Sequence, residues 1–189
     1  MLAALLSACA GDLGETSQAG DTTLAAYRSP AQAPARATAA KTERRYFIEF
    51  RARTYPPFGH TYMIYGTLDR NGNPLESNYI GFTPKGGAAG YAAGSSPAFV
   101  PGTLEPLEGD FNMTPLTSYR HSLEPGQYAD LLAFDASARE ESHWWNLYLN
   151  NCNSFAAEMA RAAGISAPIV PTVVPMIFVS ELRDLNENM

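Results

Sequence analysis

The segment of residues 60–68 (HTYMIYGTL) constrains the fold most, since it is apolar on nearly both faces. Such a strand belongs in the interior of a sheet that is covered on both sides. Upstream, residues 46–53 (YFIEFRAR) alternate with the period of a half-buried strand. Downstream, an Asn-Gly step within residues 69–74 predicts a turn, after which residues 78–82 return as a third strand. We therefore expect a central antiparallel hairpin.

The second half of the chain favours helices. Pro125 suits a first helical position, and we expect a helix over residues 125–139. A second is expected over residues 152–163, between Asn151 as N-cap and Gly164 as terminator, and a third over residues 176–185. Residues 116–123 are expected to form a strand, residues 86–106 a long loop, and residues 140–151 a connection. Strands followed mainly by helices indicate an α+β domain, with an antiparallel sheet packed against helices, over residues 43–189.

The N-terminal region has a different character. Residues 1–9 (MLAALLSAC) look like the end of a bacterial lipoprotein signal, in which Cys9 is acylated after cleavage. No basic residue and only a short apolar run precede Cys9, so either translation starts further upstream or the match is fortuitous. Residues 10–42 are rich in Ala, Gly, Ser, Thr and Pro, and predict a flexible tether.

Composition excludes several classes of function. The net charge of -6 argues against a nucleic-acid partner. No stretch approaches the roughly 20 apolar residues that cross a bilayer. Neither Cys-x-x-Cys nor His-Glu-x-x-His occurs, and residues 86–106 lack a phosphate-binding glycine motif, so we expect no metal and no cofactor.

Cys152 is the residue that most suggests chemistry. Cys152, Phe155, Ala156 and Met159 share the apolar face of the predicted helix, so the thiol is expected to point toward the sheet from the first turn. A helix N-terminus stabilises a thiolate and lowers the pKa of a cysteine placed there. A nucleophilic cysteine also needs a base, usually histidine. The competing interpretation is an inert buried cysteine, which is the commoner case.

Three histidines compete for the role of base. His60 opens the apolar strand, shares a face with Tyr62 and is expected to face a core helix. His121 lies in the strand expected over residues 116–123, and His143 lies in the connection before Cys152. Catalytic partners usually meet through the fold and not through sequence proximity. The residues alone favour His60 by a modest margin and leave both rivals open.

Residues 146–155 (NLYLNNCNSF) resemble the Asn-Cys-x-x-Phe helix start of circularly permuted papain-like thiol hydrolases. That superfamily includes permuted NlpC-type, LRAT-like and PPPDE proteins, whose histidine strand precedes the cysteine helix. Gly59-His60-Thr61 before an apolar strand looks like their histidine segment, and the likeness covers residues 46–164. It implies Cys152 as nucleophile, His60 as base, and the backbone amide of Cys152 as part of the oxyanion site.

Many members carry a third polar residue that orients the imidazole, often on the strand after the histidine strand. Residues 71–82 contain no histidine, which departs from the LRAT-like pattern. Asn78 is the expected substitute, and His121 is a weaker alternative.

The family's activities lead to three expectations. The first is a lipid-anchored cell-envelope hydrolase that cleaves a peptidoglycan peptide amide through an acyl-enzyme. The second is a lipid acyl hydrolase or acyltransferase of LRAT-like type, for which the apolar stretch of residues 165–178 could line an acyl groove. The third is a non-catalytic envelope lipoprotein that uses the same fold for binding. Ala10 in place of aspartate favours the outer membrane for the anchored protein.

Replacement of Cys9 tests the anchor. Expressed in a bacterium from its natural start, the protein should partition into detergent, and Cys9→Ser should move it to the aqueous phase, because the acyl chains supply the membrane affinity. Phase separation with Triton X-114 measures this. Equal partitioning of the two proteins would exclude acylation at Cys9.

Overall fold

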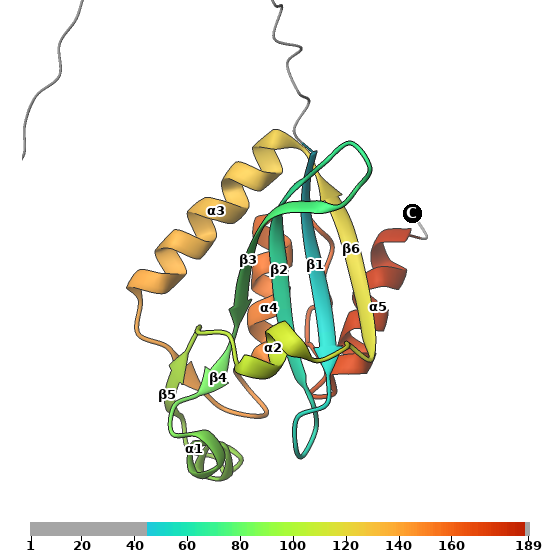
Figure 1. Ribbon diagram of the computed structural model, residues 1–189. Coiled ribbons are helices and arrows are strands. Elements are labelled where there is room, and N and C mark those ends of the chain that lie inside the picture. Colours follow the sequence, from blue (N-terminus) through green and yellow to red (C-terminus); the bar gives the residue numbers. More distant parts are fainter. Residues whose placement is uncertain (1–44, 188–189) are drawn as a thin grey trace, which may run out of the picture. The chain divides into compact units, whose positions relative to one another are not determined.

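The computed structural model describes residues 45–187 (Figure 1). Cys9, the predicted tether and the first residues of the predicted domain lie outside the described residues. The main sheet is antiparallel, in the order β3-β2-β1-β6. Its strands are β1 (Arg45–Arg53), β2 (His60–Leu68), β3 (Pro74–Gly81) and β6 (Thr117–Leu123). The predicted α+β class and the hairpin over residues 60–82 are confirmed.

Strand β2 is buried along its whole length, as its apolar sequence predicts. It lies between β1 and β3, so both of its edges are hydrogen-bonded. Its two faces contribute to different parts of the core. Met63 and Tyr65 belong to the large core cluster that also includes the helices, whereas Tyr62 and Ile64 belong to a smaller cluster on the opposite face.

Three helices build the large cluster with the sheet. They are α3 (Pro125–Glu140), α4 (Cys152–Ala162) and α5 (Pro175–Glu187), close to the predicted helices. Helices α4 and α5 cover one face of the sheet, with α4 behind β2 and α5 behind β6 (Figure 1). Phe155, Ala156 and Met159 of α4 are buried in this cluster, which confirms the predicted apolar face of the helix.

The opposite face of the sheet carries a short helix that sequence reasoning did not predict. Helix α2 (Glu108–Asn112) lies in front of β1 and β2 (Figure 1). A Cβ on Gly109 would lie 2.9 Å from Cζ of Arg53, so α2 packs closely on the arginine face of β1. On this face the buried carboxylate of Asp110, a residue of α2, contacts Arg53 of β1.

The predicted long loop over residues 86–106 is wrong in two places. Helix α1 (Gly87–Gly94) forms despite its many glycines, and β5 (Val100–Thr103) pairs with both β4 (Thr83–Pro84) and β7 (Trp144–Trp145). The small sheet that results also corrects the prediction of a plain connection over residues 140–151. Close packing explains the glycines better than mobility does, because a Cβ on Gly94 would lie 2.5 Å from the ring of Trp145.

A buried amide attaches the start of α4 to β2. Thr61 donates its hydroxyl to Oδ1 of Asn153 at 2.6 Å, and Nδ2 of Asn153 donates to the carbonyl of Thr172 at 2.5 Å. Asn153 is fully buried. One side chain therefore joins the central strand, the first turn of α4 and the segment that leads into α5. In the described part of the chain, no helix is long and apolar enough to cross a membrane.

Replacing Asn153 tests this attachment. Asn153→Leu keeps a similar volume but leaves the Thr61 hydroxyl and the Thr172 carbonyl without these partners, and each unsatisfied buried group costs about 1–3 kcal/mol. Urea unfolding should show a loss of at least about 1–3 kcal/mol from the buried Thr61 hydroxyl, to which the partly buried Thr172 carbonyl adds. The control is Asn112→Leu at an exposed position of α2, which should shift stability by no more than about 0.5 kcal/mol. Equal stabilities for the two variants would contradict the role of Asn153.

Candidate active site

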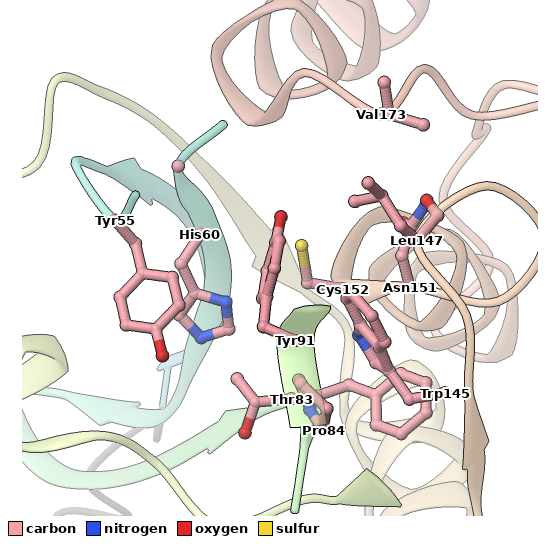
Figure 2. A pocket seen from close by; sticks show the side chains of 12 residues that line it. Tyr55, His60, Thr83, Pro84, Tyr91, Trp145, Leu147, Asn151, Cys152 and Val173 are labelled. Atoms are coloured by element: carbon pink, nitrogen blue, oxygen red, sulfur yellow. The ribbon is translucent and has the colours of Figure 1, made fainter. Parts of the chain in front are cut away.

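Cys152 and His60 line the same cavity. Figure 2 shows their side chains entering it from α4 and from the start of β2, together with Tyr91 and Trp145. The free volume is about 10 Å³, which is room for about one water molecule. The structure thus brings together the two residues that the sequence favoured, although 92 positions separate them (152 − 60).

The position of Cys152 follows from the cap of α4. Oδ1 of Asn151 accepts from the backbone amides of Asn153 and Ser154 at 2.8 and 3.2 Å, and Oγ of Ser154 accepts from the amide of Asn151 at 2.7 Å. This reciprocal cap fixes the first turn, as predicted for Asn151. Cys152 is therefore the first helical residue and remains partly exposed. Its sulfur lies 3.7 Å from Oδ1 of Asn153, an acceptor held in place by Thr61.

The prediction that His60 faces a core helix is wrong, because its side chain lies on the other face of the sheet. In the β1–β2 register, Thr61 pairs with Ala52 and His60 with Arg53. Thr61 faces α4, so the alternation of a strand turns His60 toward the opposite face, where α2 lies. His60 is the first residue of β2, and β3 ends at Gly81, opposite Tyr62. The imidazole therefore lies at the end of the sheet, next to the N-terminus of α4.

Gly81 provides space for the imidazole. A Cβ at this position would lie 2.7 Å from Nε2 of His60 and 3.5 Å from Oδ2 of Asp110. Such a contact is closer than carbon and nitrogen atoms allow, so a larger residue would displace the ring. The absence of a side chain at Gly81 is thus a condition for the arrangement of His60 and Asp110.

Asp110 of α2 stands behind the imidazole. Its Oδ2 lies 3.7 Å from Nε2 of His60, beyond hydrogen-bond range but within range of an ion pair with the imidazolium. Its Oδ1 accepts from Nε of Arg53 at 2.7 Å, and its Oδ2 accepts from the amide of Leu107 at 2.7 Å. Both Arg53 and Asp110 are buried. A carboxylate so held is charged and is directed at the His60 imidazole.

The electrostatics favour a protonated imidazole. Complete burial lowers the pKa of His60, but Asp110 and the Cys152 sulfur outweigh it and raise the pKa from 6.5 to about 8. Burial likewise tends to raise the pKa of Asp110, but His60, Arg53 and the Leu107 amide lower it below its ordinary value. The buried chain of groups therefore runs Arg53, Asp110, His60, Cys152, with alternating charge when the sulfur is a thiolate.

Three aromatic side chains narrow the cavity. Tyr55 lies 6.1 Å from the His60 ring and 6.2 Å from the Tyr91 ring, centroid to centroid, and Tyr91 lies 5.0 Å from the Trp145 ring. Tyr91 comes from α1, the helix in the segment predicted as a loop. Burial and the nearby Cys152 raise the pKa of Tyr91 to about 12, so its hydroxyl stays protonated and can donate a hydrogen bond.

The other sequence candidates lie elsewhere. Asn78 is exposed on β3, opposite Tyr65 in the register, and does not line the cavity. His121 is on β6 and forms a 2.7 Å hydrogen bond with the Tyr119 hydroxyl, and burial lowers its pKa. His143 contacts the carbonyl of Ala138 through Nε2 at 2.6 Å and lines a separate depression. The polar side chain beside the His60 imidazole is that of Asp110 and not that of Asn78 or His121.

Sequence reasoning missed Asp110, Arg53 and Tyr91. Asp110 comes from a helix of only five residues in a connection, where no periodic pattern develops. The sequence did hold a signal for Arg53. This residue ends a strand whose opposite face is apolar, and a buried arginine there needs an acidic partner. Tyr91 stands alone among glycines and alanines in residues 86–94, where a large aromatic residue suggests a packing contact.

The raised pKa of His60 predicts a dependence of stability on pH. The imidazolium is favoured in the folded state, so this contribution is complete below pH 6.5 and is lost as the pH rises through about 8. Relative to His60→Gln, the unfolding free energy of the wild type should fall by about 2 kcal/mol between pH 6 and 9. Urea titrations at several pH values measure the difference.

His121→Gln provides the matched control. Because the pKa of His121 is lowered, the wild type should lose stability relative to this variant as the pH falls below 6.5, and change little above it. A difference between wild type and His60→Gln that stays constant from pH 6 to 9 would contradict the ion pair at His60.

Within residues 45–187, no group of three or more His, Cys, Asp or Glu side chains is arranged to hold a metal ion. Comparison of the chain with protein-family models, with curated proteins and with solved structures found no match. The geometry of the cavity therefore carries the functional argument.

Proposed function

We propose that this protein is a thiol hydrolase in which Cys152 attacks an acyl carbonyl and His60 transfers the protons. The observation that supports this proposal is the shared cavity of Cys152 and His60, with the charged Asp110 behind the imidazole. An inert core cysteine does not require a buried imidazole and carboxylate beside it. A buried ion pair such as that of Arg53 and Asp110 adds little stability over apolar residues of similar volume, which favours a role for the pair at the site.

The chemistry follows from the arrangement. Transfer of the Cys152 proton to neutral His60 gives the imidazolium–thiolate pair, and the thiolate then forms a C–S bond with the substrate carbonyl carbon. The backbone amide of Cys152 is suited to stabilise the oxyanion, whereas the next two amides of α4 are bonded to Asn151. Collapse of this intermediate breaks the bond to the amine or alcohol, which takes the proton from His60 and leaves a thioester. Water then attacks the thioester, its proton passes to His60, and the C–S bond breaks to release the acid.

Asp110 acts as a positioning residue in this scheme. Its carboxylate faces Nε2 of His60, so it favours the tautomer with the proton on Nε2 and leaves Nδ1 free to serve the sulfur. Arg53 holds Oδ1 of the carboxylate and fixes its direction. This arrangement takes the part of the third polar residue that the papain-like resemblance implies.

The substrate class follows from the resemblance and from the predicted anchor. An envelope protein tethered through Cys9 would meet the peptide stems of peptidoglycan, whose amide bonds suit an acyl-enzyme mechanism. Lipid esters and amides are the second candidates, since the anchored domain would also lie at a membrane surface. Both classes present the carbonyl that Cys152 requires.

Turnover by site variants tests the proposal. Cys152→Ala should abolish the release of product from p-nitrophenyl acetate, peptidoglycan stem peptides and phospholipids. His60→Gln should lower kcat about 10²–10⁴-fold, the usual contribution of a general base. Asp110→Asn should lower kcat by a smaller factor, and should also shift the pH profile, because the imidazolium loses its counter-charge.

His143→Gln is the matched control, because His143 lines a different depression and should leave turnover unchanged. The rate of Cys152 carboxymethylation by iodoacetamide gives a second readout that needs no substrate. If His60→Gln leaves that rate unchanged and no substrate is turned over, the protein is a binding module and the hydrolase proposal is wrong.

A further inference from the structure

A larger depression lies next to the reaction cavity. It has a volume of about 370 Å³ and shares Tyr55 and Gly59 with the cavity of Cys152 as lining residues. The segment that leads into α5 also connects the two spaces. Val173 lines the cavity of Cys152, and Pro175 and Met176, two and three residues later, line the depression. A substrate whose carbonyl lies at Cys152 has to place its remaining atoms outside a 10 Å³ space. This depression adjoins that space, as do a depression that shares Phe82 with it and one that shares Asn151, but those two are also lined by charged residues such as Glu158.

The walls of the depression are mostly apolar. Six of its lining residues form an aliphatic and aromatic surface: Pro56, Pro57, Phe58, Leu116, Pro175 and Met176. Phe58, Leu116 and Met176 are 46%, 53% and 46% exposed, which is unusual for large apolar side chains at one place. Among residues 45–187, no acidic residue lines it, and its one basic lining residue, Arg53, is paired with Asp110. The surface therefore suits an uncharged group.

The backbone of the depression offers few hydrogen bonds to a peptide. Its prolines have no amide hydrogen, the Gly59 amide donates to the Tyr55 carbonyl at 2.6 Å, and the Leu116 amide donates to the Ala52 carbonyl at 2.7 Å. The Thr54 carbonyl accepts from Nη1 of Arg53 at 2.9 Å. A peptide stem laid here would not find partners in these groups, whereas an aliphatic chain needs none.

From these observations we infer that the depression between the 53–59 segment, Leu116 and the start of α5 holds the aliphatic acyl chain of the substrate, with its carbonyl at Cys152. This inference rests on the proposed thiol hydrolase and specifies its substrate class: fatty acyl esters or amides instead of peptidoglycan stems. The sequence-based expectation that residues 165–178 line an acyl groove is narrowed to Pro175 and Met176, with most of the walls supplied by residues 53–59.

A chain-length series tests the inference. With p-nitrophenyl esters from acetate to octanoate, kcat/KM should rise about threefold to fourfold for each added methylene until the depression is filled. Met176→Asp should lower kcat/KM for octanoate about tenfold or more relative to kcat/KM for acetate, because the charge opposes the aliphatic chain. Ile177→Asp is the matched control, since Ile177 is similarly exposed at 49% but does not line the depression.

A second readout does not require turnover. Alkylation of Cys152 by N-octyl iodoacetamide should be faster than by iodoacetamide, and Met176→Asp but not Ile177→Asp should remove the advantage. Hydrolysis of acetate that depends on Cys152 but shows no dependence on chain length would overturn the inference and leave the hydrolase proposal standing. Chain-length-dependent alkylation without any hydrolysis would overturn the hydrolase and leave an aliphatic binding groove. Preferential cleavage of stem peptides, unaffected by Met176→Asp, would assign the site to peptidoglycan instead.

Discussion

The hydrogen bond from Thr61 to Asn153 is the contact on which the rest of the site depends. It joins the second residue of the central strand to the second residue of the helix that carries the cysteine. Neighbouring residues on each element, His60 and Cys152, are thereby brought to one place. The same amide also holds the Thr172 carbonyl, so the segment leading to α5 is fixed to this junction. A single buried side chain thus sets the positions of the reaction cavity and of one wall of the adjoining depression.

The two sides of the sheet make different contributions to the site. The face covered by α4 and α5 supplies packing and Cys152, whereas the face covered by α2 supplies the charged Asp110 and its partner Arg53 beside His60. His60 serves both because it lies at the end of β2, where β3 no longer flanks the strand. This placement also accounts for Gly81, since the imidazole needs the space that a side chain would fill.

The parts of the fold that were predictable are those in which apolar residues recur with the period of a strand or a helix. Strand β2, helix α4 and its Asn151 cap follow from local periodicity and from capping chemistry. The residues alone favoured His60 over the other histidines only modestly, and its pairing with Cys152 was implied by the papain-like resemblance. Asp110 was not predictable, because a five-residue helix has no period to detect and its role depends on a tertiary approach to Arg53. Helix α1 was not predicted because its glycines were interpreted as loop residues. At least Gly94 is instead required for close packing against the ring of Trp145.

The order of the site residues along the chain has a consequence for biosynthesis. Arg53, His60 and Asp110 are all synthesised before Cys152, and the contact that unites them with the helix spans 92 positions. Contacts of such separation form late, after the entropy of closing the intervening chain has been lost. A nascent or truncated polypeptide that ends before α4 therefore has His60 and Asp110 but lacks Cys152. The cavity that these residues share is complete only when nearly the entire domain has been made and has folded.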